Sequence, residues 1–109
     1  MVTNESFAFP AIELADGFAE PMGDGVFVVL QKDEGAVGAP MQNVVLSLWD
    51  LETLKAHDTS IDTIALEDGQ AHWMGDYFLI EQADRSVQGH PVQAIALTFD
   101  DAEALRLAA

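Results

Sequence analysis

The chain carries the same segment of about fifty residues twice in tandem, and this repeat constrains the fold more than any other feature. Residues 11–24 align with 63–76, and residues 26–58 align with 77–109 once Gly25 is skipped. In this alignment 18 of 47 pairs are identical, whereas pairing at ordinary composition would give roughly three. A unit of this size without a metal or a disulfide is too small to be comfortably stable alone. We therefore expect the two copies to share one core.

Each copy has the pattern of three strands. The segments AIELA and TIALE are short and β-prone, and each precedes Asp-Gly, which is typical of a type I′ hairpin turn. The chain then returns through FAEPM or QAHWM, and the glycine of the following Met-Gly-Asp predicts a bulge within that strand. The strand continues as VFVVLQ or YFLIEQ, whose unbroken apolar character favours burial on both faces. NVVLSL and AIALTF are the third strands.

Each copy ends with the pattern of a helix. SLWDLETLKAH and TFDDAEALRLA both open with Ser or Thr followed by Asp three residues later, so Ser47 and Thr98 are the expected N-caps. Acidic residues come early and a basic residue comes late, which suits the helix dipole. Apolar residues recur at every third position and give each helix one apolar face.

The predicted fold class is α+β. A tandem duplication of a β-β-β-α unit forms one pseudo-twofold domain over residues 1–109, with repeats at 11–58 and 63–109 and a linker at 59–62. Six antiparallel strands are expected in one curved sheet or a partly closed barrel, with two helices covering apolar surface.

Composition limits the classes of function. The formal net charge of −15 repels phosphate, so we expect no binding to nucleic acid and no docking on anionic membranes. The chain contains no cysteine, which excludes disulfides and thiolate chemistry. The N-terminal residues MVTNESFAFP do not resemble a signal peptide, and no apolar run approaches the ~20 residues of a membrane helix. A cytoplasmic protein is the expectation.

The stretch AHWMGD at residues 71–76 looks most like a site, because its first-copy counterpart is AEPMGD. The repeated Met-Gly-Asp is best explained by backbone geometry. His72 and Trp73 replace Glu-Pro, and strand alternation places them on opposite faces. With Tyr77 they are the candidate ligand-binding residues.

Metal binding has weak candidates only. Asp24 and Asp76 are equivalent turn residues, and they could form a cation site if the pseudo-twofold axis brought them together. His57, His72 and His90 have no histidine in the other copy and show no ligand spacing such as i,i+4. We predict no cofactor.

Catalysis has little support, since the chain lacks a nucleophile motif and a phosphate-binding glycine loop. The sequence favours a non-catalytic acidic module that works by binding a protein partner or by self-association. Exposed sheet edges would suit a homodimer formed by strand pairing. One alternative is binding of a small molecule or cation in a cleft between the repeats. A second alternative is an acidic mimic of nucleic acid.

Overall fold

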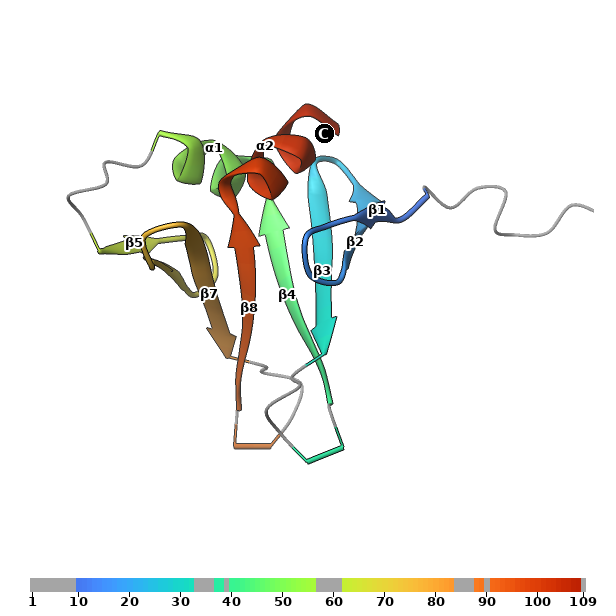
Figure 1. Ribbon diagram of the computed structural model, residues 1–109, viewed down its shortest axis with the longest axis vertical. Coiled ribbons are helices and arrows are strands. Elements are labelled where there is room, and N and C mark those ends of the chain that lie inside the picture. Colours follow the sequence, from blue (N-terminus) through green and yellow to red (C-terminus); the bar gives the residue numbers. More distant parts are fainter. Residues whose placement is uncertain are drawn as a thin grey trace, which may run out of the picture.

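The computed structural model describes residues 10–32, 37–38, 40–56, 62–83, 88–89 and 91–108, and its two halves have the same order of elements (Figure 1). The first half contains β1 (Ile12–Glu13), β2 (Phe18–Gly23), β3 (Val26–Lys32), β4 (Met41–Ser47) and α1 (Leu48–Lys55). The second half contains β5 (Thr63–Ala65), β6 (Gln70–Trp73), β7 (Tyr77–Ala83), β8 (Val92–Thr98) and α2 (Phe99–Ala108). The described residues have an α+β fold, as predicted, with two helices.

The prediction of one six-stranded sheet is wrong. The strands form two separate four-stranded antiparallel sheets, in the orders β1-β2-β3-β4 and β5-β6-β7-β8. Each half therefore contributes four strands and a helix, where the sequence pattern suggested three strands and a helix.

The extra strand in each half arises at Met-Gly-Asp, which reverses the chain where a bulge within one strand was expected. Between β2 and β3, Gly23, Asp24 and Gly25 have φ of 88°, 57° and 75°, and three successive residues with positive φ turn the backbone back on itself. Between β6 and β7, the amide of Met74 donates to the carbonyl of Tyr77 at 2.8 Å and closes the corresponding turn. A bulge does occur in the first half, at the register shift between Pro21 and Gly23.

The two Asp-Gly hairpins form as predicted, although not with type I′ turns. Gly17 and Gly69 have φ of 76° and 80°, but among described residues other than glycine only Asp24 has positive φ. A single left-handed glycine closing the loop is typical of longer hairpin loops. A methyl group on Gly17 would lie 2.0 Å from the carbonyl oxygen of Leu30, and one on Gly69 would lie 2.0 Å from that of Glu81. Glycine is therefore required at both places by close packing as well as by φ.

Strands β3 and β7 alternate between buried and half-buried residues along most of their length, so the expected full burial of both faces is not observed. Phe27, Val29 and Gln31 face the interior from β3, and Phe78, Ile80 and Gln82 do so from β7. The buried apolar side chains of both halves belong to one cluster. The expectation of a shared core is confirmed for the described residues.

The two sheets meet where β4 and β8 run side by side in the same direction (Figure 1). Glutamine side chains, which resemble peptide groups, bridge this seam. The Gln82 side chain accepts from the amide of Val45 at 2.9 Å and donates to its carbonyl. The Gln31 side chain makes the equivalent pair with Ala96, with an amide contact of 2.8 Å. Each interior glutamine thus provides hydrogen-bond partners for a backbone amide and a backbone carbonyl on the edge strand of the opposite sheet.

A second pair of glutamines repeats this pattern farther along the seam. The side-chain oxygen of Gln42 accepts from the amide of Ala94 at 3.2 Å, and that of Gln93 accepts from the amide of Asn43 at 3.3 Å. In both pairs, the glutamine of one half and the equivalent glutamine of the other half bind equivalent backbone groups on the opposite sheet.

The helices begin as predicted and tie each half to the other. The hydroxyls of Ser47 and Thr98 accept from the amides of Asp50 and Asp101 at 3.1 and 3.0 Å. Asp50 also accepts from the amide of Glu67 at 2.8 Å, and Asp101 accepts from the amide of Ala15. These two buried carboxylates therefore join each helix start to the first hairpin of the opposite half.

Neither described helix is long and apolar enough to span a membrane. Of the predicted linker 59–62, only Asp62 belongs to the described residues, and its carbonyl accepts from the amide of Trp73 at 2.9 Å.

Candidate functional site

The three candidate ligand-binding residues do not face one common site. His72 and Tyr77 lie on the outer face of the second sheet, since their strand neighbours Ala71 and Phe78 are fully buried. Trp73 packs against the core on the inner face. The placement of His72 and Trp73 on opposite faces, as expected from strand alternation, means that no single pocket on one face receives both.

His72 belongs to a small polar cluster on the outer face. Its Nε2 lies 2.8 Å from a carboxylate oxygen of Glu81 and 3.2 Å from the side-chain nitrogen of Gln70. Its Nδ1 lies 3.3 Å from the hydroxyl of Thr63. The hydrogen bond from His72, followed by one from Gln70, lowers the pKa of Glu81 below its usual 4.5. Both ring nitrogens already have partners within the chain, so the cluster is self-contained.

Trp73 forms an aromatic cluster with two rings of its own half. The ring centroids of Trp73 and Phe78 are 4.9 Å apart, and those of Trp73 and Phe99 are 5.5 Å apart with nearly perpendicular planes. Tilted and edge-on arrangements at these distances are the favourable ones for aromatic pairs. The geometry favours a structural role for Trp73.

The metal candidates Asp24 and Asp76 are exposed and lie in the hairpin turns of different sheets. Within the described ranges, no group of three or more histidine and acidic side chains is placed to hold a metal ion. His57 and His90 lie outside the described residues. The paired-aspartate site therefore stays a prediction.

A groove of about 380 Å³ lies between the halves, as the alternative function requires. It is lined by Asp16, Gln31, Lys32, Gln42, Leu79, Ala94, Ile95 and Ala96. None of the three candidate ligand-binding residues lines it. The side chains of Gln31 and Gln42 are already engaged by the backbone of β8. Half of the groove's four polar or charged lining residues thus serve the seam between the sheets.

Sequence reasoning missed an apolar surface on the outer face of the first sheet. We call this surface the outer patch and define it by Phe18, Val28, Leu30 and Val45. Phe18 pairs with Leu30 across β2 and β3, and Val28 pairs with Val45 across β3 and β4. Val45 is 43% exposed, and the other three side chains are half-buried. The patch is therefore continuous across three strands.

The corresponding positions in the second sheet are Gln70, Leu79, Glu81 and Ala96. Two of the four are polar there and belong to the cluster around His72. The mismatches Phe18/Gln70 and Leu30/Glu81 are visible in the alignment of the repeats. They indicate a surface patch only once the strand register shows that Phe18 and Leu30 are cross-strand neighbours, as are Gln70 and Glu81.

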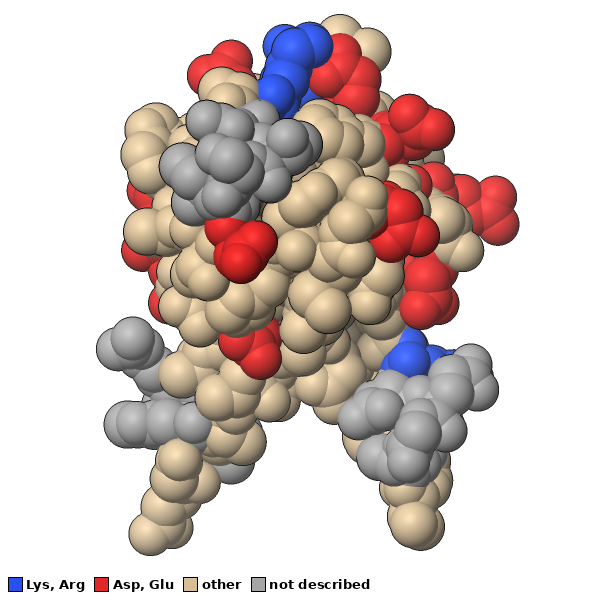
Figure 2. All heavy atoms as spheres, turned by 60° about the vertical axis from the view of Figure 1, so that its left-hand side comes forward, with Lys and Arg blue, Asp and Glu red and all other residues tan. Residues whose placement is uncertain are grey.

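On the face that Figure 2 shows, acidic side chains lie at many separate places and basic ones are few, in keeping with the 19 acidic and 4 basic residues of the chain. Two basic residues converge on Glu103 of α2. Lys55 of α1 donates to its carboxylate at 3.1 Å, and Arg106 does so at 2.8 Å. The hydrogen bond from Arg106, followed by that from Lys55, lowers the pKa of Glu103 to about 2. Two of the chain's four basic side chains are thus paired with Glu103, and Lys55 links α1 to α2 through this pair.

Comparison with models of protein families, with curated proteins and with solved structures finds no match to this chain.

Proposed function

We propose that this protein is a non-catalytic binding module whose outer patch docks a partner protein that is apolar at the centre of its contact surface and basic around it. The single observation that carries the proposal is the difference between the two outer sheet faces. The same backbone register carries Phe18 and Leu30 in one sheet and Gln70 and Glu81 in the other. Since the second sheet forms with polar residues at these positions, the fold does not require apolar ones in the first.

The basic surround of the partner follows from charge. The chain has 19 acidic and 4 basic residues, and two of the latter are held at Glu103. A partner of opposite sign gains attraction and faster encounter, whereas a second copy is repelled. Apolar area at the patch would supply the affinity that surface charges alone do not.

Self-association by strand pairing has less support than the sequence suggested. The outer edge strands β1 and β5 have two and three residues, and short edges are poor templates for pairing. The edges of β4 and β8 face each other and are bridged by glutamines.

We also propose that the two halves arose by tandem duplication and are related by a pseudo-twofold axis. The reciprocal glutamine and aspartate contacts support this origin, because each contact has its counterpart at the equivalent residues.

The test is to copy the second half's residues into the first half. The double variant Phe18→Gln/Leu30→Glu carries side chains that the same register already accommodates in the other sheet. A photo-crosslinking side chain placed at position 45 of the otherwise wild-type protein should capture a partner. The purified partner should then bind the double variant at least tenfold more weakly than it binds the wild type. The reverse variant Gln70→Phe/Glu81→Leu, changed on the second sheet, should bind as the wild type does.

Two results would overturn the proposal. One is equal affinity of the purified partner for the wild type and for Phe18→Gln/Leu30→Glu. The other is a crosslink only to further copies of this chain, together with a dimer in sedimentation velocity, which would assign the patch to self-assembly.

The second candidate function is binding of a small molecule or cation between the halves, and the groove of about 380 Å³ favours it. Two of its four polar or charged lining residues, Gln31 and Gln42, are occupied by the glutamine bridges, so we rank it below protein binding. Binding as an acidic mimic of nucleic acid stays a prediction.

A further inference from the structure

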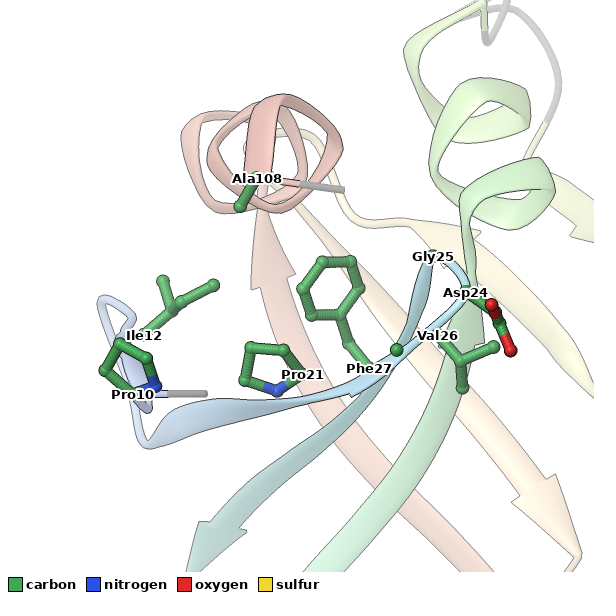
Figure 3. Close-up of a pocket in the computed structure, with 9 residues that line it drawn as sticks. Pro10, Ile12, Pro21, Asp24, Gly25, Val26, Phe27 and Ala108 are labelled. Atoms are coloured by element: carbon green, nitrogen blue, oxygen red, sulfur yellow. The ribbon is translucent and has the colours of Figure 1, made fainter. Parts of the chain in front are cut away.

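A second hollow lies on the inner side of the first sheet, away from the outer patch. It has a volume of about 360 Å³, which is at the lower end of the range for small-ligand pockets. Pro10, Ile12 and Pro21 line one side, Gly25 and Val26 lie at the other end, and Ala108 at the end of α2 lies above (Figure 3). Phe27 is only 1% exposed and forms the floor.

The side chains around this hollow are mostly apolar. Figure 3 shows the rings of Pro10, Pro21 and Phe27 and the side chain of Ile12 arranged around the open space, while the carboxylate of Asp24 points away from it. Among the described residues that line the hollow, Asp24 is the single charged one. The site therefore suits an uncharged, apolar ligand.

The second half shows what such a space accommodates. Pro21 pairs with Phe27 in the first sheet, and Trp73 pairs with Phe78 at the same register position in the second. The Trp73 indole lies tilted on the Phe78 ring at a centroid distance of 4.9 Å. The first half has the equivalent floor ring and the equivalent isoleucine, Ile12 for Ile64, but a proline where the indole would originate.

We propose that this hollow is a binding site for a small, neutral, planar aromatic molecule of about the size of indole. The ligand would lie against Phe27 and Ile12 and take the place that Trp73 fills in the other half. Aromatic rings gain from tilted or edge-on contact with phenylalanine in addition to the area that they bury. The proposal is independent of protein binding at the outer patch, because none of the patch residues lines the hollow.

Titration of the full chain with free indole, followed by ¹H–¹³C NMR of the methyl groups, tests this site. Saturable shifts should appear at the methyls of Ile12 and Val26 and leave those of Val45 unchanged. Two variants fill the hollow from within. Pro21→Trp supplies the indole that the second half has, and Ala108→Trp places one at the exposed helix end. Both should reduce indole affinity at least tenfold.

Leu107→Trp is the matched control, because its side chain is 69% exposed on the same helix turn and does not line the hollow. It should bind indole as the wild type does. Trp73→Ala should open a similar space in the second half and add a second saturable site, seen at the methyl of Ile64. Absence of saturable shifts in the wild type would overturn the proposal. So would unchanged indole affinity in folded Ala108→Trp, which remains informative if Pro21→Trp does not fold.

Discussion

At the scale of single residues, three of the identical pairs of the repeats make contacts that join the halves. Gln31/Gln82, Gln42/Gln93 and Asp50/Asp101 are conserved between the two copies, and each pair makes reciprocal hydrogen bonds across the molecule. Physical necessity explains this, because a buried amide or carboxylate without its partner costs far more than a mismatched surface residue. Where the copies differ in the core they exchange one apolar residue for another, as at Val29/Ile80 and Val44/Ile95, whereas on the outer face Phe18/Gln70 and Leu30/Glu81 exchange apolar for polar residues.

Replacing an interior glutamine should therefore weaken the seam. Gln82→Leu leaves the amide and carbonyl of Val45 without these partners, and Gln31→Leu does the same at Ala96. We expect each to lower the free energy of unfolding by about 1–3 kcal/mol. Urea unfolding measures this loss. Gln93→Leu, at a more exposed contact, should cost less, and an equal cost at all three positions would contradict the assigned roles.

Trp73 and His72 should differ sharply in their contribution to stability. Trp73→Ala removes a partly buried indole packed on Phe78 and Phe99. Fully buried aromatic side chains cost about 3–5 kcal/mol when truncated, so we expect a loss toward the lower end of that range. His72→Ala breaks contacts on a partly exposed face and should cost less than about 1 kcal/mol. Thermal melts of both variants decide the matter. A larger loss for His72→Ala would show that the outer polar cluster, rather than the ring packing, holds this hairpin.

At the scale of elements, turn chemistry decided how many strands form. The Asp-Gly hairpins, the third strand of each pattern and both capped helices could be predicted, since they depend on local signals. The reversal at Met-Gly-Asp has the Asp-Gly signal in the first copy, where Asp24-Gly25 follows Gly23, but not in the second, where Asp76 precedes Tyr77. Interpreting the repeated glycine as a bulge therefore missed the turn. Three consecutive positive φ angles at Gly23, Asp24 and Gly25 are a property of the folded backbone.

The candidate sites were predictable only in part for a similar reason. Alternation placed His72 and Trp73 on opposite faces, which needs no tertiary information. The outer patch depends on the cross-strand pairing of Phe18 with Leu30, and the inner hollow depends on α2 reaching the first sheet at Ala108. Neither relation follows from spacing along the chain.

Gly17 and Gly38 have similar φ but different surroundings, so alanine variants at the two positions distinguish the cost of a steric clash from the cost of positive φ. Gly17→Ala places a methyl group 2.0 Å from a carbonyl oxygen, whereas Gly38→Ala meets nothing within 4 Å. Both have φ near 80°, which costs an L-residue roughly 1–2 kcal/mol. We expect Gly38→Ala to lose about that amount and Gly17→Ala to lose clearly more in chemical unfolding. Equal losses would show that the β1–β2 hairpin shifts to relieve the contact.

The link between α1 and α2 should respond to acid. The pKa of Glu103 is lowered to about 2 by Arg106 and Lys55. A carboxyl group with a lowered folded-state pKa stabilises the fold above its unfolded pKa, and this contribution is lost as the pH falls toward the folded value. The stability difference between the wild type and Glu103→Gln should thus be constant near neutral pH and shrink between pH 4.5 and about 2. A difference that grows on acidification would contradict the assignment.

At the scale of the whole molecule, the two halves are equivalent in construction and different in surface. The core is one apolar cluster with residues from both halves. The glutamine bridges, the hydrogen bonds of the helix-capping aspartates and the Lys55–Glu103 ion pair also join one half to the other. A half should therefore lack both its apolar partner and the hydrogen-bonding partners of its buried polar groups. Among the described residues, the outer patch belongs to the first half, and the inner hollow lies on the sheet of that half with Ala108 of α2 as one wall. We place binding on this sheet.

A fragment of residues 1–58 tests the central claim, that two equivalent halves complete one another around a single core. Sedimentation equilibrium and far-UV circular dichroism of this fragment should show an unfolded chain, or a folded dimer in which a second copy supplies the missing half. In the dimer, Gln31→Leu should abolish assembly, because Gln31 would bridge to the equivalent edge strand of the other copy. A folded monomer of residues 1–58 would contradict the account.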